Sequence, residues 1–500
     1  MIKIEQTRND FENDIGPLVK SFFPEQEVCF KAILPKKGIS KKEGQYLQQE
    51  IEYYLFVIIE EHVMRLIFSN AKKESIFDVS DQADLAEKPE YRNVIKRLLY
   101  HALSAYTKKE LPWGAQTGVR PAKIALDRLE LGWQEKEIAD FMKEHYLCSK
   151  EKIELSIKIA KKEASLLAKL QDKKGYSIYI GIAFCPSKCL YCSFPSYPLE
   201  KFGGLMDDYL LALFKEIDYA SNCITKKQLQ TVYVGGGTPT ALDEKHLEML
   251  LKKIRDTLDF TYVQEFTVEA GRPDSLTMEK LHLLKQYGVT RISVNPQTMN
   301  QKTLDLIGRY HCVEDVKRAF AMARQAGHNN INMDLIMGLP GEDIKHVVHT
   351  LDEIGKLSPD SLTVHTLALK RASNLTIYKE KYQTLPKNTK EMIRLAAEFT
   401  ENHGYFPYYL YRQKNMTGNL ENVGYALPEK EGLYNILMME ERQTILALGA
   451  GATSKYVFPT GGRIERTDNC KSIVDYIERI EEMIGRKRDF LKREEKNLLG

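Results

Sequence analysis

Three cysteines in FCPSKCLYCSF (184–194) are the residues whose types and spacing point most directly to chemistry. Cys185, Cys189 and Cys192 form a CxxxCxxC pattern. Three thiolates on so short a loop suit three irons of a [4Fe–4S] cubane, and the fourth iron then stays open to a ligand. A zinc site and three ordinary buried thiols are the alternatives. Zinc is disfavoured because it needs a fourth protein ligand, and the next histidine along the chain after the motif is His246.

A run of three glycines follows an apolar stretch in TVYVGGGTPT (231–240). Gly235, Gly236 and Gly237 would let a ligand lie against the backbone where a Cβ atom would clash, and Thr238 adds a hydroxyl. A glycine-rich turn that only closes a strand–helix unit is the alternative, and it is the more frequent case for such a motif alone. The sequence therefore makes this turn a candidate binding segment and leaves the structural alternative open.

Polar side chains lie at or near the ends of the later predicted strands. Glu269 follows EFTV, Gln297 follows RISVN, Arg309 comes after the next helical turn, and Asp334 lies within INMDLI. Each alone could be a helix cap or a surface group. Four of them at one barrel mouth predict a binding site, because an unpaired buried polar group costs a few kcal/mol.

The elements that would position these residues alternate regularly from Ser177 onward. The predicted strands are 177–183, 231–234, 265–269, 291–294, 331–336 and 362–366, and the predicted helices are 206–222, 243–257, 276–287, 313–326 and 342–356. Strand–helix units in series with right-handed crossovers form a parallel sheet. Six units predict the fold class α/β, with a partial six-stranded (β/α)6 TIM-like barrel that carries its chemistry at the carboxyl ends of the strands.

The barrel is predicted to be the middle one of three domains. Residues 1–170 predict a small N-terminal α/β domain with a helical linker, 171–403 the barrel, and 404–500 a C-terminal α+β extension that caps the substrate. The N-terminal assignment rests on strand-like runs in 27–34 and 50–68 and on helical periodicity in 91–109 and 153–171.

The composition is that of a globular protein without a strong charge bias. The 500 residues include 72 Lys and Arg against 69 Asp and Glu, a formal net charge of +3, so no bulk field favours nucleic acid or a membrane surface. Apolar runs such as Tyr53 to Ile59 are far shorter than the ~20 residues that span a bilayer. Eight cysteines are too few for a disulfide scaffold. We therefore expect a cytoplasmic protein that neither binds nucleic acid nor inserts into a membrane.

Taken together, these motifs resemble the radical S-adenosylmethionine superfamily. Within it, YIGIAFCPSKCLYCSF, GGGTPT, RISVNPQTMNQKTLDLIGRYH and NMDLIMGLPGE resemble the oxygen-independent coproporphyrinogen III oxidase (dehydrogenase) family. TGVRP (117–121) and PYYLYRQKNMTGNLENVGYA (407–426) are most similar to its HemZ-like branch. The similarity extends over about residues 177 to 460.

The resemblance implies a set of site residues. Cys185, Cys189 and Cys192 would bind the [4Fe–4S] cluster and, with Tyr179, would form the catalytic group. One or two molecules of S-adenosyl-L-methionine would be bound by Tyr179, Tyr191, Gly235, Gly236, Gly237, Thr238, Glu269, Gln297, Arg309, Asp334 and Ala368.

The resemblance also implies an activity, the oxidative decarboxylation of coproporphyrinogen III to protoporphyrinogen IX in haem biosynthesis. Its partners would be this tetrapyrrole, an electron donor such as flavodoxin or ferredoxin, and an electron acceptor. A substrate with four carboxylates needs cations, for which the candidates are Arg272, Lys370, Arg371, Arg412 and Lys414.

Two related functions stay open as alternatives, a haem-binding chaperone and an anaerobic radical enzyme that modifies haem. Gly181 and Ser193 stand where well-studied members of the family carry a histidine and a fourth cysteine. The haem-chaperone branch carries a C-terminal His-Asn element, whereas ENVGYA (421–426) has no neighbouring histidine. The first departure bears on the substrate, and the second favours the enzyme over the chaperone.

The cysteine pattern generates a direct prediction about iron. After anaerobic reconstitution the protein should bind about four irons and four sulfides, and Cys185→Ala, Cys189→Ala or Cys192→Ala should each abolish the cluster. Iron and sulfide analysis with the visible absorption spectrum measures this, and Cys223→Ala serves as the control outside the motif. Full iron content in any of the three variants would refute the assignment.

Overall fold

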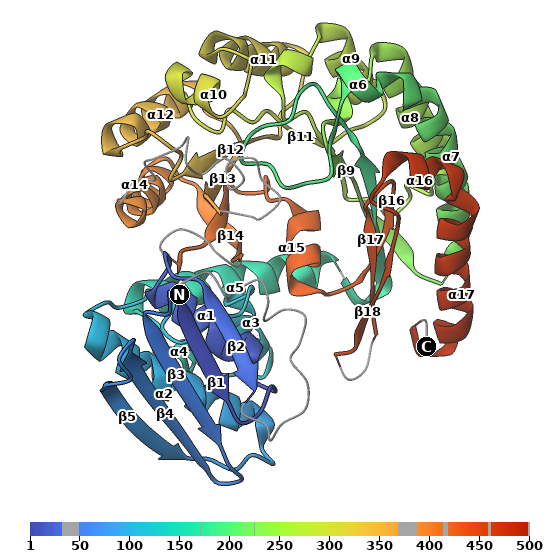
Figure 1. Cartoon of the computed structure of the whole chain (residues 1–500). Helices are drawn as coiled ribbons and strands as arrows, with labels where there is room; N and C mark the ends of the chain where they lie inside the picture. Colours follow the sequence, from blue (N-terminus) through green and yellow to red (C-terminus); the bar gives the residue numbers. More distant parts are fainter. Residues whose placement is uncertain are drawn as a thin grey trace. The chain divides into compact units, whose positions relative to one another are not determined.

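The computed structural model describes residues 1–32, 50–170, 172–224, 226–368, 388–413, 419–458 and 462–498 (Figure 1). The chain divides into two compact units, one of Met1–Lys158 with Arg412–Glu421, and one of Ile159–Tyr411 with Asn422–Gly500. The division after Lys158 falls within helix α5 (Lys150–Leu170). The division into three domains, with boundaries near 170 and 403, stays a prediction.

The first unit contains a five-stranded sheet in the order β2-β1-β3-β4-β5. Its strands are β1 (Ile2–Gln6), β2 (Val28–Ala32), β3 (Tyr53–Ile59), β4 (Val63–Asn70) and β5 (Ser75–Gln82), and its helices besides α5 are α1 (Glu12–Phe22), α2 (Lys88–Thr107), α3 (Ala122–Glu130) and α4 (Glu135–Tyr146). The predicted strand stretch 50–68 corresponds to β3 and β4, and the predicted helix 91–109 to α2. Residues 33 and 34 of the predicted strand 27–34 lie outside the described residues.

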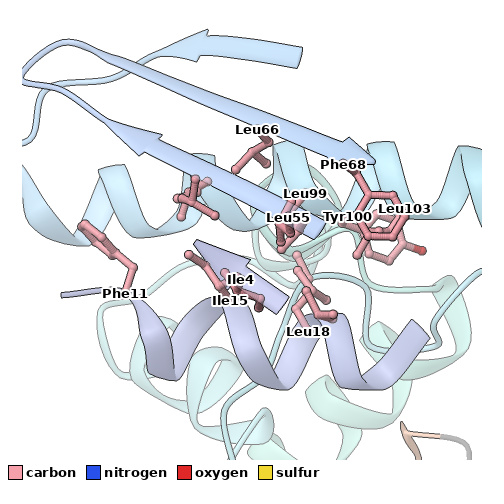
Figure 2. Packing of buried hydrophobic residues seen from close by; sticks show 14 of the residues in the cluster. Ile4, Phe11, Ile15, Leu18, Leu55, Leu66, Phe68, Leu99, Tyr100 and Leu103 are labelled. Atoms are coloured by element: carbon pink, nitrogen blue, oxygen red, sulfur yellow. The ribbon is translucent and has the colours of Figure 1, made fainter. Parts of the chain in front are cut away.

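Apolar side chains between this sheet and helices α1 and α2 form the core of the first unit (Figure 2). Ile4, Leu55 and Leu66 come from three neighbouring strands, while Leu18 comes from α1 and Leu99 from α2. All five are at most 1% exposed. Burial of each such side chain stabilises the fold by roughly 1.5–3 kcal/mol. The sequence analysis did not predict α1, in which Pro17 lies inside the helix and disguises it.

The second unit is built on one sheet of eleven strands in the order β14-β15-β13-β12-β11-β10-β9-β6-β16-β17-β18. The six predicted strands are β6 (Gly175–Ile182), β9 (Gln228–Gly236), β10 (Glu265–Glu269), β11 (Arg291–Ser293), β12 (Ile331–Met337) and β13 (Ser361–Thr366). They lie side by side and parallel. This confirms the α/β fold with a central parallel sheet.

The C-terminal part of the chain adds strands at both edges of this sheet, which the sequence analysis did not foresee. β16 (Thr444–Leu448) is a seventh parallel strand, paired with β6. β17 (Thr453–Val457) and β18 (Ile464–Asp468) continue from it antiparallel, and β15 (Asn422–Ala426) and β14 (Phe406–Tyr411) extend the opposite edge beyond β13. The sheet is open, with β14 and β18 at its edges.

Helices follow the parallel strands and lie along the outer side of the curved sheet (Figure 1). They are α7 (Met206–Cys223), α8 (Glu244–Thr257), α9 (Met278–Gln286), α11 (Val313–Gln325), α12 (Ile344–Leu357) and α14 (Thr389–Asn402). Side chains that accept backbone N–H groups begin three of them, Asp243 for α8, Thr277 for α9 and Asp343 for α12. Shorter or later elements are β7 (Phe184–Cys185), β8 (Tyr197–Pro198), α6 (Leu199–Phe202), α10 (Gln301–Leu306), α15 (Leu433–Glu440), α16 (Ile473–Glu478) and α17 (Ile480–Leu498). Among the described residues, no helix is long and apolar enough to cross a membrane.

A buried ion pair joins the C-terminal helix α17 to α7. Lys487 Nζ lies 2.7 Å from Glu216 Oε1, and the two side chains are 1% and 0% exposed. Tyr476 Oη and the Gly449 N–H donate to the other carboxylate oxygen at 2.7 and 2.8 Å. Gly449 belongs to the turn after β16, so this carboxylate connects the last helix to the edge of the parallel sheet.

Removing the cation of this pair should destabilise the protein strongly. Lys487→Met keeps the aliphatic stem and leaves Glu216 buried without its counter-charge, which is expected to lower the free energy of unfolding by about 3 kcal/mol. Urea unfolding measures the loss. Lys215→Met is the matched control, since Lys215 pairs with Glu481 at the surface and its loss should cost less than about 1 kcal/mol. Equal effects of the two substitutions would contradict the assigned role of the buried pair.

Candidate functional site

Cys185 ends the short strand β7, and Cys189 and Cys192 lie on the loop that joins β7 to β8; this segment is called the cysteine loop. Phe184 pairs with Tyr197 across these strands, which closes the loop at its base. Within the loop, the Cys192 N–H donates to the Cys189 carbonyl at 3.2 Å. Leu190 N–H donates to the Ile307 carbonyl at 3.0 Å, which ties the loop to the segment after α10. The loop is therefore held at both ends and in its middle.

The chemistry of the three thiols fits a cluster better than a single metal ion. Cys189 is buried, while Cys185 and Cys192 are half-buried. Burial raises the pKa of the Cys185 thiol to about 11, against the opposing effect of a hydrogen bond from Thr238. Such a thiol ionises when a metal cation compensates its charge. In the described parts of the chain, no three His, Cys, Asp or Glu side chains lie close enough together to bind one metal ion. In a cubane, each thiolate binds a different iron.

The glycine turn after β9 packs directly against the cysteine loop. Gly237 N–H donates to the Ile182 carbonyl at 2.6 Å, and Thr238 N–H donates to the Phe184 carbonyl at 2.7 Å. A Cβ atom on Gly237 would lie only 2.4 Å from the Phe184 oxygen, and Gly236 has a φ of +104°. Close approach of the protein's own backbone therefore explains these two glycines, so a role in ligand binding needs separate support.

A carboxyl group and three stacked tyrosines lie next to this turn. Tyr233 Oη donates to Glu269 Oε1 at 2.6 Å. Burial raises the pKa of Glu269 to about 7, so this carboxyl titrates near neutral pH. The Tyr233 ring stacks on Tyr179 and Tyr434, with centroids 6.1 and 4.5 Å apart. Sequence reasoning named Tyr179 and Glu269 but missed Tyr233 and Tyr434. The position of Tyr233 in β9, two residues before the glycines, could have indicated it. No sequence feature indicates Tyr434.

Arg309 is almost fully buried, and its contacts connect the cysteine loop to the ends of β10 and β11. Its Nη1 donates to Tyr191 Oη at 2.9 Å, and its Nη2 donates to the carbonyls of Gly271 and Asn295 at 2.6 and 2.8 Å. Its Nε is buried and has no hydrogen-bond partner within the described ranges. A buried donor without a partner is costly, which makes this nitrogen a candidate ligand contact.

Asp334 lies in β12 and is kept ionised by its neighbours. Burial opposes its charge, but hydrogen bonds from His365, Asn332 and Thr363 outweigh burial and lower the pKa of the carboxyl. Asn295 Nδ2 also donates to Asp334 Oδ2 at 2.9 Å. The ring of His365 lies 3.6 Å from Asp334 and 3.3 Å from Tyr411 Oη.

Gln297 adopts a backbone conformation that is rare for its residue type. Its φ is +69°, and it is 8% exposed. Its N–H donates to the Asp334 carbonyl at 3.0 Å, and its own carbonyl accepts from Ile336 N–H at 2.9 Å. Left-handed backbone in a residue other than glycine costs energy and is concentrated at functional sites. The neighbouring strand β12 holds this conformation in place.

Two of the five predicted substrate cations lie within the described residues, and each makes its contacts inside its own unit. The guanidinium of Arg272 faces the cysteine loop. Arg412 belongs to the first unit, where its Nη1 donates to the Gln116 carbonyl at 2.6 Å. Lys370, Arg371 and Lys414 lie outside the described residues. Ala368, the last predicted cofactor residue, follows β13 and is half-buried.

The positions that depart from the family pattern are also resolved in the structure. A Cβ atom on Gly181 would lie 3.3 Å from the Leu448 carbonyl and 3.3 Å from the Tyr179 ring, so a side chain there would have to displace the neighbouring strand or the ring. Ser193 follows Cys192 and is half-buried. The tight packing of Gly181 against β16 gives a steric reason for the glycine.

Comparisons with known proteins cover the part of the chain that carries these motifs. The model of the Radical SAM superfamily matches residues 179–354. The oxygen-independent coproporphyrinogen-III oxidase-like protein HemZ of Bacillus subtilis is 42% identical over 82% of this chain and 83% of its own length. The heme chaperone HemW of Bacillus subtilis is 33% identical over 61% of this chain and 76% of its own length. Coproporphyrinogen III oxidase (HemN) from Escherichia coli, a radical SAM enzyme, has a similar fold with a TM-score of 0.51 at 23% identity, covering 63% of this chain and 73% of that one.

The raised pKa of Glu269 predicts how stability changes with pH. A carboxyl whose pKa is higher in the folded protein than in the unfolded chain stabilises the fold below about pH 4.5, and this contribution is lost as the pH rises through about 7. Glu269→Gln should therefore have a free energy of unfolding close to that of wild type at pH 5 and exceed it by roughly 1–3 kcal/mol at pH 8. Urea unfolding from pH 5 to 8 measures this, with exposed Glu279→Gln as control. A difference independent of pH would contradict the shift.

Proposed function

We propose a function from the family to which this chain belongs. It is a member of the radical S-adenosylmethionine superfamily and, within it, of the family of oxygen-independent coproporphyrinogen-III oxidase-like proteins. The proposed reaction is the oxidative decarboxylation of propionate side chains of coproporphyrinogen III to give protoporphyrinogen IX. The observation that carries the proposal is the position of the three-cysteine loop at the carboxyl ends of the parallel strands, against the glycine turn and in contact with Arg309. A [4Fe–4S] cluster with bound S-adenosylmethionine supplies hydrogen-atom abstraction from a C–H bond that acid–base chemistry leaves inert.

Cys185, Cys189 and Cys192 would hold the cluster. They come from one loop whose backbone is closed at its base and fixed in its middle. Thr238 Oγ1 already lies 3.6 Å from Cys185 Sγ, and hydrogen bonds to ligand sulfurs stabilise their ionised form. The loop contributes no fourth cysteine ligand, so one iron would stay open to S-adenosylmethionine.

Glu269 is the group that we assign to the amino end of S-adenosylmethionine. It lies beside the glycine turn, and the Gly236 N–H and the Tyr233 hydroxyl both donate to its carboxylate. The amino group of S-adenosylmethionine would donate hydrogen bonds to this buried carboxyl, and such bonds favour its ionised form and offset the cost of burial. Tyr179 would cover the same region with an aromatic face.

The remaining part of S-adenosylmethionine, or a second molecule of it, would be bound by Gln297, Arg309 and Asp334. The support is the buried Arg309 Nε without a partner, the ionised carboxyl of Asp334, and the left-handed backbone of Gln297. These three residues are connected to one another through Asn295 and β12, so their positions depend on each other. Such a network holds polar groups in place before a ligand arrives.

The choice of a tetrapyrrole substrate rests on the relatives. HemZ is described as coproporphyrinogen-III oxidase-like, whereas the HemW relatives are described as heme chaperones, so a chaperone is the competing function. The sequence ENVGYA (421–426) has no neighbouring histidine, which favours the enzyme. A flavodoxin-like or ferredoxin-like protein would supply the electrons, and a separate acceptor would take up those released in the reaction.

The enzyme and the chaperone differ in their products. The reconstituted protein should convert coproporphyrinogen III to protoporphyrinogen IX under anaerobic conditions with S-adenosylmethionine and dithionite, and 5′-deoxyadenosine should accumulate. Mass spectrometry measures both products, with haem in place of coproporphyrinogen as the parallel reaction. Glu269→Ala should weaken S-adenosylmethionine binding at least tenfold at unchanged iron content, because it removes the carboxylate proposed to accept hydrogen bonds from the amino group.

Three other outcomes would lead to different conclusions. Stoichiometric haem binding without 5′-deoxyadenosine would establish the chaperone instead. Formation of 5′-deoxyadenosine with haem but not with coproporphyrinogen would identify an enzyme that modifies haem. Unchanged S-adenosylmethionine affinity in Glu269→Ala, with the exposed Glu279→Ala as matched control, would reject the role assigned to this carboxyl.

A further inference from the structure

Arg272 donates a hydrogen bond directly to a sulfur of the cysteine loop. It follows β10, is 4% exposed, and its Nη1 lies 3.6 Å from Cys189 Sγ and 3.1 Å from Ser187 Oγ. Its Nε and Nη2 donate to the two carboxylate oxygens of Asp274 at 2.9 and 2.7 Å. One edge of the guanidinium is thus fixed by a bidentate carboxylate, and the remaining nitrogen is directed at the loop. All three guanidinium nitrogens already donate hydrogen bonds within the protein, so we do not expect this arginine to bind a substrate carboxylate.

The charges around this contact can be assigned from the surrounding groups. Burial opposes the ionisation of Asp274, but the Arg272 guanidinium outweighs it and lowers the pKa of that carboxyl. His311 is 1% exposed with its Nδ1 3.8 Å from Asp274, and burial together with Arg309 lowers its pKa to about 3, so it is neutral. Arg309 directs its hydrogen bonds to Tyr191 and to backbone carbonyls. The charged pair at Cys189 is therefore Arg272 with Asp274.

A buried cation beside a ligand sulfur changes the energy of reduction. Adding one electron makes an iron–sulfur cluster more negative by one charge, and a nearby positive charge stabilises that state. Hydrogen bonds to the sulfurs, net charge and burial are the properties by which a protein sets the potential of such a cluster. Solvent and salt screen a buried charge much less than a surface charge, so the effect of Arg272 should persist at physiological ionic strength.

We propose that Arg272 is a positioning residue that raises the reduction potential of the cluster through its hydrogen bond to Cys189, and that Asp274 limits this effect while it fixes the guanidinium. The proposal rests on the proposed function, because it requires the cluster. The step concerned is the transfer of one electron from an external one-electron donor to the oxidised cluster, without any proton or bond change at Arg272. The pair would match the potential of the cluster to that of its donor.

The test compares the reduction potentials of reconstituted full-length variants. Dithionite titration is followed by the electron paramagnetic resonance signal of the reduced cluster, with iron and sulfide content measured in the same samples. Arg272→Gln removes the cation, and Arg272→Lys keeps the charge but loses the bidentate hydrogen bonds of the guanidinium. Asp274→Asn removes the counter-charge. Arg324→Gln is the matched control, because Arg324 pairs with Asp360 at 2.6 Å, next to the start of β13 and at the amino ends of the strands.

The expected shifts differ in sign, which a merely structural role would not produce. At the wild-type midpoint potential, the ratio of reduced to oxidised cluster should fall about tenfold in Arg272→Gln, equivalent to about 59 mV for a one-electron couple. The ratio should fall less in Arg272→Lys, rise in Asp274→Asn, and stay unchanged in Arg324→Gln.

Two results would overturn the proposal. One is an unchanged potential at full iron content in Arg272→Gln. The other is a shift of the same sign in Arg272→Gln and Asp274→Asn, which would indicate that both substitutions only loosen the loop. If Arg272→Gln does not retain iron, Arg272→Lys and Asp274→Asn decide the question by the sign of their shifts. A wild-type protein that assembles no cluster would reject the proposed function itself, and is thereby distinguished from a failure of this inference.

Discussion

The close contact between the turn after β9 and the loop after β6 is the constraint on which the site depends. The N–H groups of Gly237 and Thr238 donate to backbone carbonyls at Ile182 and Phe184, and no room remains for a Cβ atom at Gly237. Because Cys185 directly follows Phe184, this contact sets where the cysteine loop begins. Glycine is required there for steric reasons, since any side chain would push the loop away from the sheet. The glycine motif, which the sequence suggests as a ligand-binding turn, is therefore first required for the packing of two backbone segments.

Buried charges hold the rest of the site, and each is compensated by specific partners. Arg272 is matched by Asp274, and Arg309 is held by backbone carbonyls and Tyr191. Asp334 receives donors from several strands, whereas Glu269 has fewer and keeps a raised pKa. Charges in a low-dielectric interior are expensive unless paired, so this concentration at the strand ends is hard to explain by stability alone. It fits a site that must bind and orient a charged cofactor.

The C-terminal part of the chain contributes a strand to the parallel sheet and a side chain to the site. β16 pairs with β6, the strand that leads into the cysteine loop, and Tyr434 from α15 completes the stack on Tyr233. The buried pair Glu216 and Lys487 anchors the last helix near the turn that follows β16. The parallel sheet that carries the site is therefore completed by a strand that begins at Thr444, far downstream of its first strand at Gly175.

The sequence by itself determined the local features of this protein. The periodicity of strands and helices after Ser177 predicted the parallel sheet, and the spacing of Cys185, Cys189 and Cys192 predicted a candidate cluster loop, because both signals lie within short stretches of chain. Only the tertiary structure decided which side chains meet. Arg272 was predicted as a substrate cation, yet it contacts Ser187, a residue 85 positions away. Such contacts depend on how crossovers align distant strand ends, and neither composition nor spacing contains that information, since the same residue types pair equally well in many other arrangements.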